Sequence, residues 1–221
     1  MIPLRDVIPS RTAPVVTITI IVLNALAWFF EIGLPPEDRQ LFLTIYGVVP
    51  ASFRPVTLIT SMFLHGSWMH VIGNMWYLWI FGDNIEDRLG HGRFIVFYLL
   101  CGIAAAFGQI AIDPSSTLPT IGASGAIAGV MGAYFVLYPR SRVLTLVPLI
   151  FWWEIFELPA IVLLGFWFLM QLFSAGAIAV TSNTAGGGVA FMAHVVGFAA
   201  GMVAVFVFRQ RQHSPWQDAS Y

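Results

Sequence analysis

The sequence is poor in charge. Only 10% of its 221 residues are acidic or basic, its net charge is −1, and it contains no lysine, because all ten basic residues are arginines. No block of like charges occurs, which predicts that nucleic acid is not a partner. Apolar residues make up 58% of the chain, and the mean hydropathy is +0.83. Because soluble domains are far less apolar, the composition predicts an integral membrane protein in contact with lipid.

Cysteine is almost absent too. The one cysteine, Cys101, lies inside an apolar run and has no partner for a disulfide within the chain. Zinc proteases need clustered ligands such as HExxH, which the sequence lacks, and His65 and His70 do not share a helical face. We therefore expect neither a metal site nor a cofactor.

Long apolar runs are what the sequence has in abundance, and a helix that crosses a bilayer needs about 20 such residues. Charges, prolines and glycine clusters divide the chain into six runs, at about residues 14–34, 68–85, 92–112, 123–138, 157–175 and 189–208. This pattern predicts an all-α polytopic membrane protein with one domain over residues 1–221 and a cytoplasmic tail at 209–221. The first run is too long for a signal peptide, so we expect it to be retained. Two further apolar stretches, 41–67 and 144–157, suit segments that lie in the interface or dip partway into the membrane.

The arginines are distributed unevenly over the loops. Only Arg39 and Arg54 lie in the first loop, and loops three and five have none. The other eight lie in the tails, at loop two and in loop four: Arg5, Arg11, Arg88, Arg93, Arg140, Arg142, Arg209 and Arg211. The positive-inside rule therefore predicts that both termini are cytoplasmic.

Four polar side chains lie in the outer half of the predicted spans. Ser124 begins span four, His194 lies about a turn and a half into span six, and His70 and Asn74 occupy the first turns of span two. Polar groups at this depth are costly and usually mark function. Each also has a structural reading, because a membrane serine often bonds a backbone carbonyl, and a histidine or asparagine often bridges two helices.

Small residues surround the serine and follow the histidine at helical spacing. They include two GxxxG patterns, and such faces let membrane helices approach closely. The glycines are Gly122, Gly125, Gly129, Gly132, Gly197 and Gly201. If spans four and six pack through these faces, Ser124 and His194 meet at one end, as a nucleophile beside a base.

Three motifs carry a family resemblance. The segments HGSWMHVIGN (65–74), GASG (122–125) and AHVVGFAAG (193–201), in a chain with six predicted spans, resemble the rhomboid intramembrane serine proteases. The resemblance covers nearly the whole chain. It implies a compact bundle of six helices, in which loop one (35–67) is partly embedded in the membrane. Span five, together with the loop that precedes it, would be a movable flank through which a substrate helix enters.

The resemblance also implies a catalytic dyad without an acidic third member. Ser124 would be the nucleophile and His194 the general base, and the oxyanion would be held by His70, Asn74 and the backbone N–H of Ser124. The implied reaction is hydrolysis of a peptide bond in or near a transmembrane segment of another protein, close to the outer face. The short tails suit a bacterial cytoplasmic membrane.

One departure and two alternatives accompany the resemblance. Some relatives carry an aromatic residue one turn after the nucleophile, packed on the imidazole; this chain has Ala128, so other rings would have to orient His194. A non-cleaving relative that binds membrane helices is the alternative function, although such proteins typically lack the serine or the histidine. A transporter would show inverted repeats and interrupted helices, which the sequence lacks. The sequence does not specify an oligomeric state.

Overall fold

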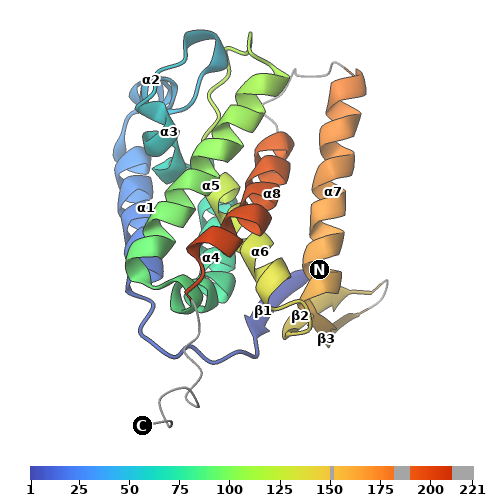
Figure 1. The fold of residues 1–221 in the computed structure, drawn as a ribbon. Helices are drawn as coiled ribbons and strands as arrows, with labels where there is room; N and C mark the ends of the chain where they lie inside the picture. The colour runs from blue at the N-terminus through green and yellow to red at the C-terminus, as the bar shows by residue number, and fades with distance from the viewer. Residues whose placement is uncertain (150–151, 182–189, 211–221) are drawn as a thin grey trace.

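The computed structural model describes residues 1–149, 152–181 and 190–210. These residues form a helix bundle with a small sheet at one end (Figure 1). The helices are α1 (Val15–Gly33), α2 (Pro36–Tyr46), α3 (Thr57–Thr60), α4 (Trp68–Leu89), α5 (His91–Ile112), α6 (Ser124–Leu137), α7 (Ala160–Thr181) and α8 (Phe191–Phe208). Short 3-10 turns lie at Pro50–Ser52 and Ser61–Phe63.

Each predicted span overlaps one helix. Within the described residues, α1, α5, α7 and α8 are long and apolar enough to cross a membrane, whereas α6 is apolar but shorter. α4 begins at Trp68 as predicted, with Ser67 as its N-cap, and continues past residue 85 to Leu89. The chain is therefore a helical integral membrane protein, and the count of six spans stays a prediction. Most of the predicted tail, residues 211–221, lies outside the described residues.

The all-α prediction is wrong at one end of the bundle. There, β1 (Ile2–Asp6), β2 (Arg142–Pro148) and β3 (Trp153–Pro159) form an antiparallel sheet in the order β1-β2-β3. Buried Val143 and Thr145 alternate with more exposed neighbours, which is the period of a strand with one packed face. Pro148, the last residue of β2, is also unfavourable inside a helix because it lacks a backbone N–H. Because β3 occupies residues up to Pro159, α7 begins at Ala160 rather than at 157.

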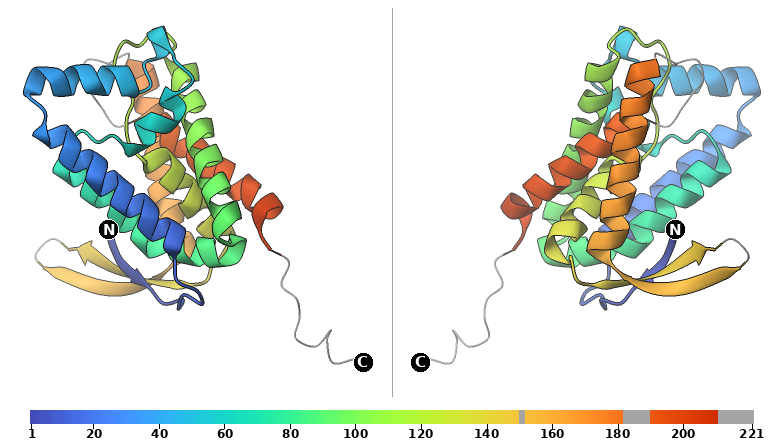
Figure 2. Two further views of the ribbon diagram at one scale, coloured as in Figure 1. Left: turned by 90° about the vertical axis from the view of Figure 1, so that its left-hand side faces the viewer. Right: turned by 90° about the vertical axis from the view of Figure 1, so that its right-hand side faces the viewer.

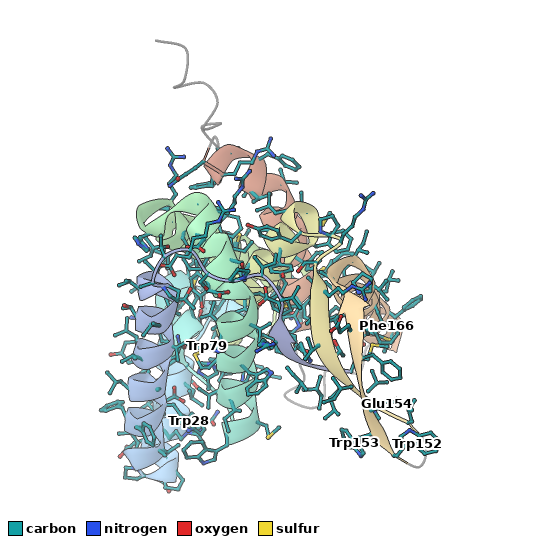
Figure 3. All side chains as sticks on the ribbon, turned by 90° about the horizontal axis from the view of Figure 1, so that it is seen from below. Trp28, Trp79, Trp152, Trp153, Glu154 and Phe166 are labelled. Atoms are coloured by element: carbon teal, nitrogen blue, oxygen red, sulfur yellow. The ribbon has the colours of Figure 1, made fainter. Side chains whose placement is uncertain are left out.

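The β2–β3 hairpin extends sideways from the bundle. Figure 3 shows Trp152 and Trp153 near its tip, away from the helices, and their side chains are 58% and 61% exposed. The segment 144–157, which we predicted to lie in the interface, thus belongs to a hairpin with exposed aromatic rings. Trp side chains are enriched at membrane interfaces, so an interfacial position of this hairpin stays a prediction.

Loop one lies at the opposite end from the sheet, where α2 runs across the bundle (Figure 2). The Glu31 carboxylate of α1 accepts hydrogen bonds from the backbone N–H of His65, at 3.1 and 3.3 Å. The Arg39 guanidinium donates to the carbonyls of His65 and Gly66 and lies 5.2 Å from the Trp28 ring centroid. Loop one is thereby fastened to α1, and its depth in a membrane stays a prediction.

α6 forms the centre of the bundle. Every residue from Gly125 to Tyr134 is buried, and α4, α5, α7 and α8 pack around the helix. α7 stands at one side of the bundle (Figure 1). Its residues Leu163 and Leu164 are buried against the core, whereas Phe166 and Phe173 are exposed. α7 therefore contacts the bundle through one face only.

Candidate active site

Ser124 and His194 lie in direct contact. The Oγ atom of Ser124 is 2.8 Å from Nε2 of His194, which is hydrogen-bonding distance. Ser124 is the first residue of α6 and is half-buried, whereas His194 lies in the first turn of α8 and is 9% exposed. The two residues that sequence analysis selected as nucleophile and base are thus brought together from positions 70 residues apart.

The turn before α6 depends on Gly122. Its φ angle is +121°, a conformation that side chains disfavour, and its backbone N–H donates to the carbonyl of Ser61 at 2.8 Å. The helix then begins at Ser124, where first-turn N–H groups have no intrahelical acceptor. The serine hydroxyl therefore lies beside backbone donors that could bind an anion.

Glycines allow α6 and α8 to approach until backbone touches backbone. A Cβ atom on Gly197 would lie 2.2 Å from the Gly125 carbonyl oxygen, and one on Gly201 would lie 1.9 Å from that of Gly129. A Cβ on Gly132 would lie 2.1 Å from the carbonyl oxygen of Phe198. All of these separations are far inside van der Waals contact. This close approach sets the distance between the helix starts that carry Ser124 and His194.

His70 and Asn74 of α4 lie against the turn that precedes Ser124. A Cβ on Gly122 would be 2.7 Å from Nε2 of His70 and 3.6 Å from Nδ2 of Asn74, so both polar groups face this glycine. Both side chains therefore lie beside a glycine that is two residues away from Ser124 along the chain. Their role in holding an oxyanion stays a prediction.

His65, which does not share a helical face with His70, still lies beside His70 and Asn74. Its side chain is fully buried, and its Nε2 lies 2.9 Å from the Asn74 amide nitrogen. Its ring centroid is also 5.0 Å from that of His70. His65 precedes α4, which begins at Trp68. His65 therefore orients Asn74 from outside the helix.

α7 supplies two contacts to His194 that the sequence analysis missed. Gln171 Oε1 is 2.8 Å from Nδ1 of His194, and the ring of Trp167 lies 5.8 Å from the imidazole at an interplanar angle of 36°. Trp167 thus supplies an aromatic ring near His194, which Ala128 on α6 does not. The available signal was an amide side chain in a largely apolar span, four positions after a tryptophan and so on the same helical face.

The comparison with known families covers this part of the chain. A model of the Rhomboid domain matches residues 52–211, which include α3 to α8 and all the side chains just described. The chain belongs to the rhomboid family. The motifs quoted from the sequence therefore lie inside the matched rhomboid domain.

Several named rhomboids are similar to this chain. The putative rhomboid protease YdcA of Bacillus subtilis (strain 168) is 33% identical over 130 residues, which are 58% of this chain and 64% of that protein. Rhomboid protein 1, mitochondrial, of Saccharomyces cerevisiae is 32% identical over 96 residues, 42% of this chain and 28% of that protein. Rhomboid-like protein 11, chloroplastic, of Arabidopsis thaliana is 28% identical over 198 residues, 83% of this chain and 65% of that protein. Each match spans less than two thirds of the relative's own length.

The rhomboid site contains no cluster of metal ligands in the described part of the chain, where no three His, Cys, Asp or Glu side chains gather in a suitable arrangement. The groups that surround Ser124 are imidazoles, amides and backbone N–H groups. Such groups suit proton transfer and the binding of a developing negative charge.

Proposed function

We propose that this rhomboid is an intramembrane serine endopeptidase that uses Ser124 and His194 as a dyad. The observation that carries the proposal is the 2.8 Å contact between the serine Oγ and the histidine Nε2. A serine hydroxyl is a weak nucleophile by itself and becomes reactive when an adjacent base removes its proton. The buried imidazole is placed to do so.

The first half of the proposed reaction forms an acyl-enzyme. Ser124 Oγ attacks the carbonyl carbon of the scissile peptide bond while its proton passes to Nε2 of His194. The tetrahedral intermediate carries its negative charge on the former carbonyl oxygen. His194 then gives the proton to the leaving amine, the C–N bond breaks, and the acyl group remains on Ser124.

The second half hydrolyses this ester. His194 takes a proton from water, whose oxygen attacks the acyl carbon, and the proton returns to Ser124 Oγ as the C–O bond breaks. In both halves, we expect the oxyanion to be bound by the Ser124 N–H and by His70 and Asn74. Asn74 is supported by its contact with His65, which restricts the amide to one orientation.

The proposed substrate is a transmembrane segment of another membrane protein. An intact helix hides its carbonyl groups in i to i+4 hydrogen bonds. We therefore expect cleavage where helix-weakening residues expose the bond, after a small residue and close to the outer face.

The proposed orientation places both termini on the cytoplasmic side. Two contacts support the grouping of the arginine-rich segments at one end of the bundle. β1 in the N-terminal tail pairs with β2 in loop four, and the N–H of Gln210 donates to the carbonyl of Arg88 in loop two at 3.1 Å. The proposed location, a bacterial cytoplasmic membrane, rests on the sequence.

The test is cleavage of a model single-span substrate by purified protein in detergent. We expect Ser124→Ala and His194→Ala to abolish cleavage while Ser115→Ala, in the exposed loop before α6, cleaves like the wild type. Thermal unfolding would verify that all variants are folded. If the wild type binds the substrate helix without cleaving it, the proposal fails and the non-cleaving alternative replaces it.

A further inference from the structure

Gln171 defines which nitrogen of His194 carries the proton. An amide oxygen can only accept a hydrogen bond, so Nδ1 of His194 must be the donor in its 2.8 Å contact with Gln171 Oε1. A neutral imidazole has one proton, which leaves Nε2 with a free lone pair. That nitrogen faces Ser124 Oγ at 2.8 Å, so this tautomer is the one able to accept the serine proton.

The same face of α7 restricts the imidazole ring in a second way. Trp167 lies one turn before Gln171, and its ring packs near both His194 and Phe198, at centroid distances of 5.8 and 6.0 Å. The ring limits how far the imidazole can tilt, and the hydrogen bond limits its rotation. Together they fix the direction of the lone pair on Nε2.

The position of α7 is itself fixed at the end near the sheet. The N–H of Ala160 donates to the carbonyl of Ser141 at 2.7 Å, and that of Ile161 donates to the carbonyl of Pro139 at 3.0 Å. Gln171 lies further along the helix, about 16 Å from this attachment at 1.5 Å per residue. The contact with His194 therefore depends on how α7 packs against α8 along its length.

We propose that Gln171 is a positioning residue, supplied by α7, that holds His194 in the tautomer and orientation required to accept the Ser124 proton. This inference rests on the proposed function and deepens it. α7 thereby belongs to the active site, and the dyad is complete only when this helix packs against α8.

A neutral amide suits this task in a membrane. A carboxylate at the same position would stabilise the imidazolium, but its own burial in an apolar helix is costly. In the described part of the chain, no carboxylate is bonded to His194. The amide supplies orientation without a buried charge, which leaves the imidazole without the added basicity that an acidic partner gives.

The competing explanation is that the hydrogen bond to His194 only gives the half-buried Gln171 amide a partner, and that Gln171 serves the packing of α7 against α8. The two readings differ in what a substitution changes. Loss of packing would lower stability and affect substrate binding. Loss of positioning would lower kcat at unchanged KM, and a change in the partner's charge would move the pH profile.

The experiment compares three variants in the cleavage assay. Gln171→Met keeps the length of the side chain and removes the acceptor, while Gln171→Glu keeps the acceptor and adds charge. Gln109→Met is the matched control, because Gln109 lies on α5 and its buried Oε1 has no partner among the described residues. His70, the other titratable group that acts electrostatically on His194, is unchanged in every variant.

We expect Gln171→Met to lower kcat roughly tenfold, the value of one hydrogen bond, with KM within about twofold of wild type. Gln171→Glu should retain cleavage, and the acid limb of its kcat/KM profile should move to higher pH, because a carboxylate favours the imidazolium. Gln109→Met should match the wild type in both respects.

Two results would overturn the positioning role while leaving the proposed function intact: a wild-type kcat in Gln171→Met, or an unmoved acid limb in Gln171→Glu. Failure of the proposed function is recognised separately, because wild type would then cleave no more than Ser124→Ala in the same assay.

Discussion

At the residue scale, α6 and α8 can lie so close together because the glycines between them have no Cβ atom. The glycines of both helices leave room for the carbonyl oxygens of the opposite helix, so close contact replaces the usual layer of side chains. Membrane helices associate without a hydrophobic driving force, which makes this packing the main source of their attraction. The distance between Ser124 and His194 therefore depends on these backbone contacts.

Gly201→Ala should therefore separate the two helices. The added methyl group would lie 1.9 Å from the carbonyl oxygen of Gly129, and backbone atoms cannot move aside as a side chain can. We expect the variant to lose about 3 kcal/mol of stability, at the upper end of overpacking costs, and most of its cleavage activity. Thermal unfolding in detergent and the cleavage assay measure the two effects.

The matched control is Gly176→Ala on α7, where a Cβ atom would meet nothing within 4 Å. Its stability should change by less than about 1 kcal/mol, the range of helix propensity. Equal unfolding temperatures for the two alanine variants would show that close backbone approach does not stabilise this bundle.

The contact between residues that lie in short motifs was predictable, and contacts that depend on how the helices pack were not. Ser124 and His194 stand in motifs and share a depth, so their meeting could be inferred from helical periodicity. Gln171 lies on a helix with no motif, and its contact depends on the rotation of α7 about its axis. The contact of His65 with Asn74 likewise depends on how the chain folds back before the Ser67 cap of α4, which hydrophobicity does not reveal.

At the element scale, a carboxylate of α4 forms the N-terminal cap of α1. α1 has no side-chain cap of its own, since Pro14 precedes it. The buried Glu86 side chain accepts hydrogen bonds from the N–H groups of Val16 and Thr17, both at 2.8 Å. A negative charge at a helix N-terminus is favourable because it faces unpaired donors and the positive end of the dipole. This contact also explains why α4 continues beyond the predicted end of span two.

Glu86→Ala should consequently destabilise the α1–α4 pair. We expect a loss of about 2 kcal/mol in the free energy of unfolding, because the two hydrogen bonds to α1 and the 2.6 Å contact with His91 Nδ1 disappear, and a buried helix end is left unpaired. Hydrogen exchange at the amides of Val16 and Thr17 should become faster. Glu37→Ala, at the exposed first turn of α2, is the control and should change little. Unaltered exchange at Val16 and Thr17 in Glu86→Ala would exclude the capping role.

The sheet could not be predicted from hydrophobicity alone. Residues 144–157 are apolar and aromatic, which fits an interfacial segment and a strand equally well. β2 pairs with β1, whose five residues lie at the N-terminus, far from loop four in the sequence. No local pattern in loop four indicates that the N-terminus pairs with it. Neither RVLTLVP nor WEIFELP alternates apolar with polar residues, so the sequence did not indicate the hairpin.

At the scale of the whole molecule, one buried carboxylate joins the sheet to the bundle. Asp6 on β1 is 9% exposed, and its Oδ2 accepts hydrogen bonds from Tyr134 of α6 at 2.7 Å and from Asn84 of α4 at 2.8 Å. Burial raises the pKa of Asp6 from 3.8 to about 6; the hydrogen bond from Tyr134 opposes the rise, and the nearby Asp83 carboxylate adds to it. The sheet and two central helices therefore meet at a group that titrates near neutral pH.

The raised pKa makes stability depend on pH in a defined direction. The folded state holds the Asp6 proton more tightly than the unfolded state, so this contribution is fully present below about pH 4 and is lost as the pH rises through about 6. Asp6→Asn stays neutral and keeps an acceptor for Tyr134 and Asn84. At pH 7.5 it should be more stable than wild type, by up to about 3 kcal/mol, and the difference should vanish toward pH 4. Thermal unfolding in detergent across this range measures the difference, with the exposed Asp38→Asn as control. If the wild type and Asp6→Asn differ equally at pH 4 and pH 7.5, ionisation of Asp6 does not govern how the sheet holds the bundle.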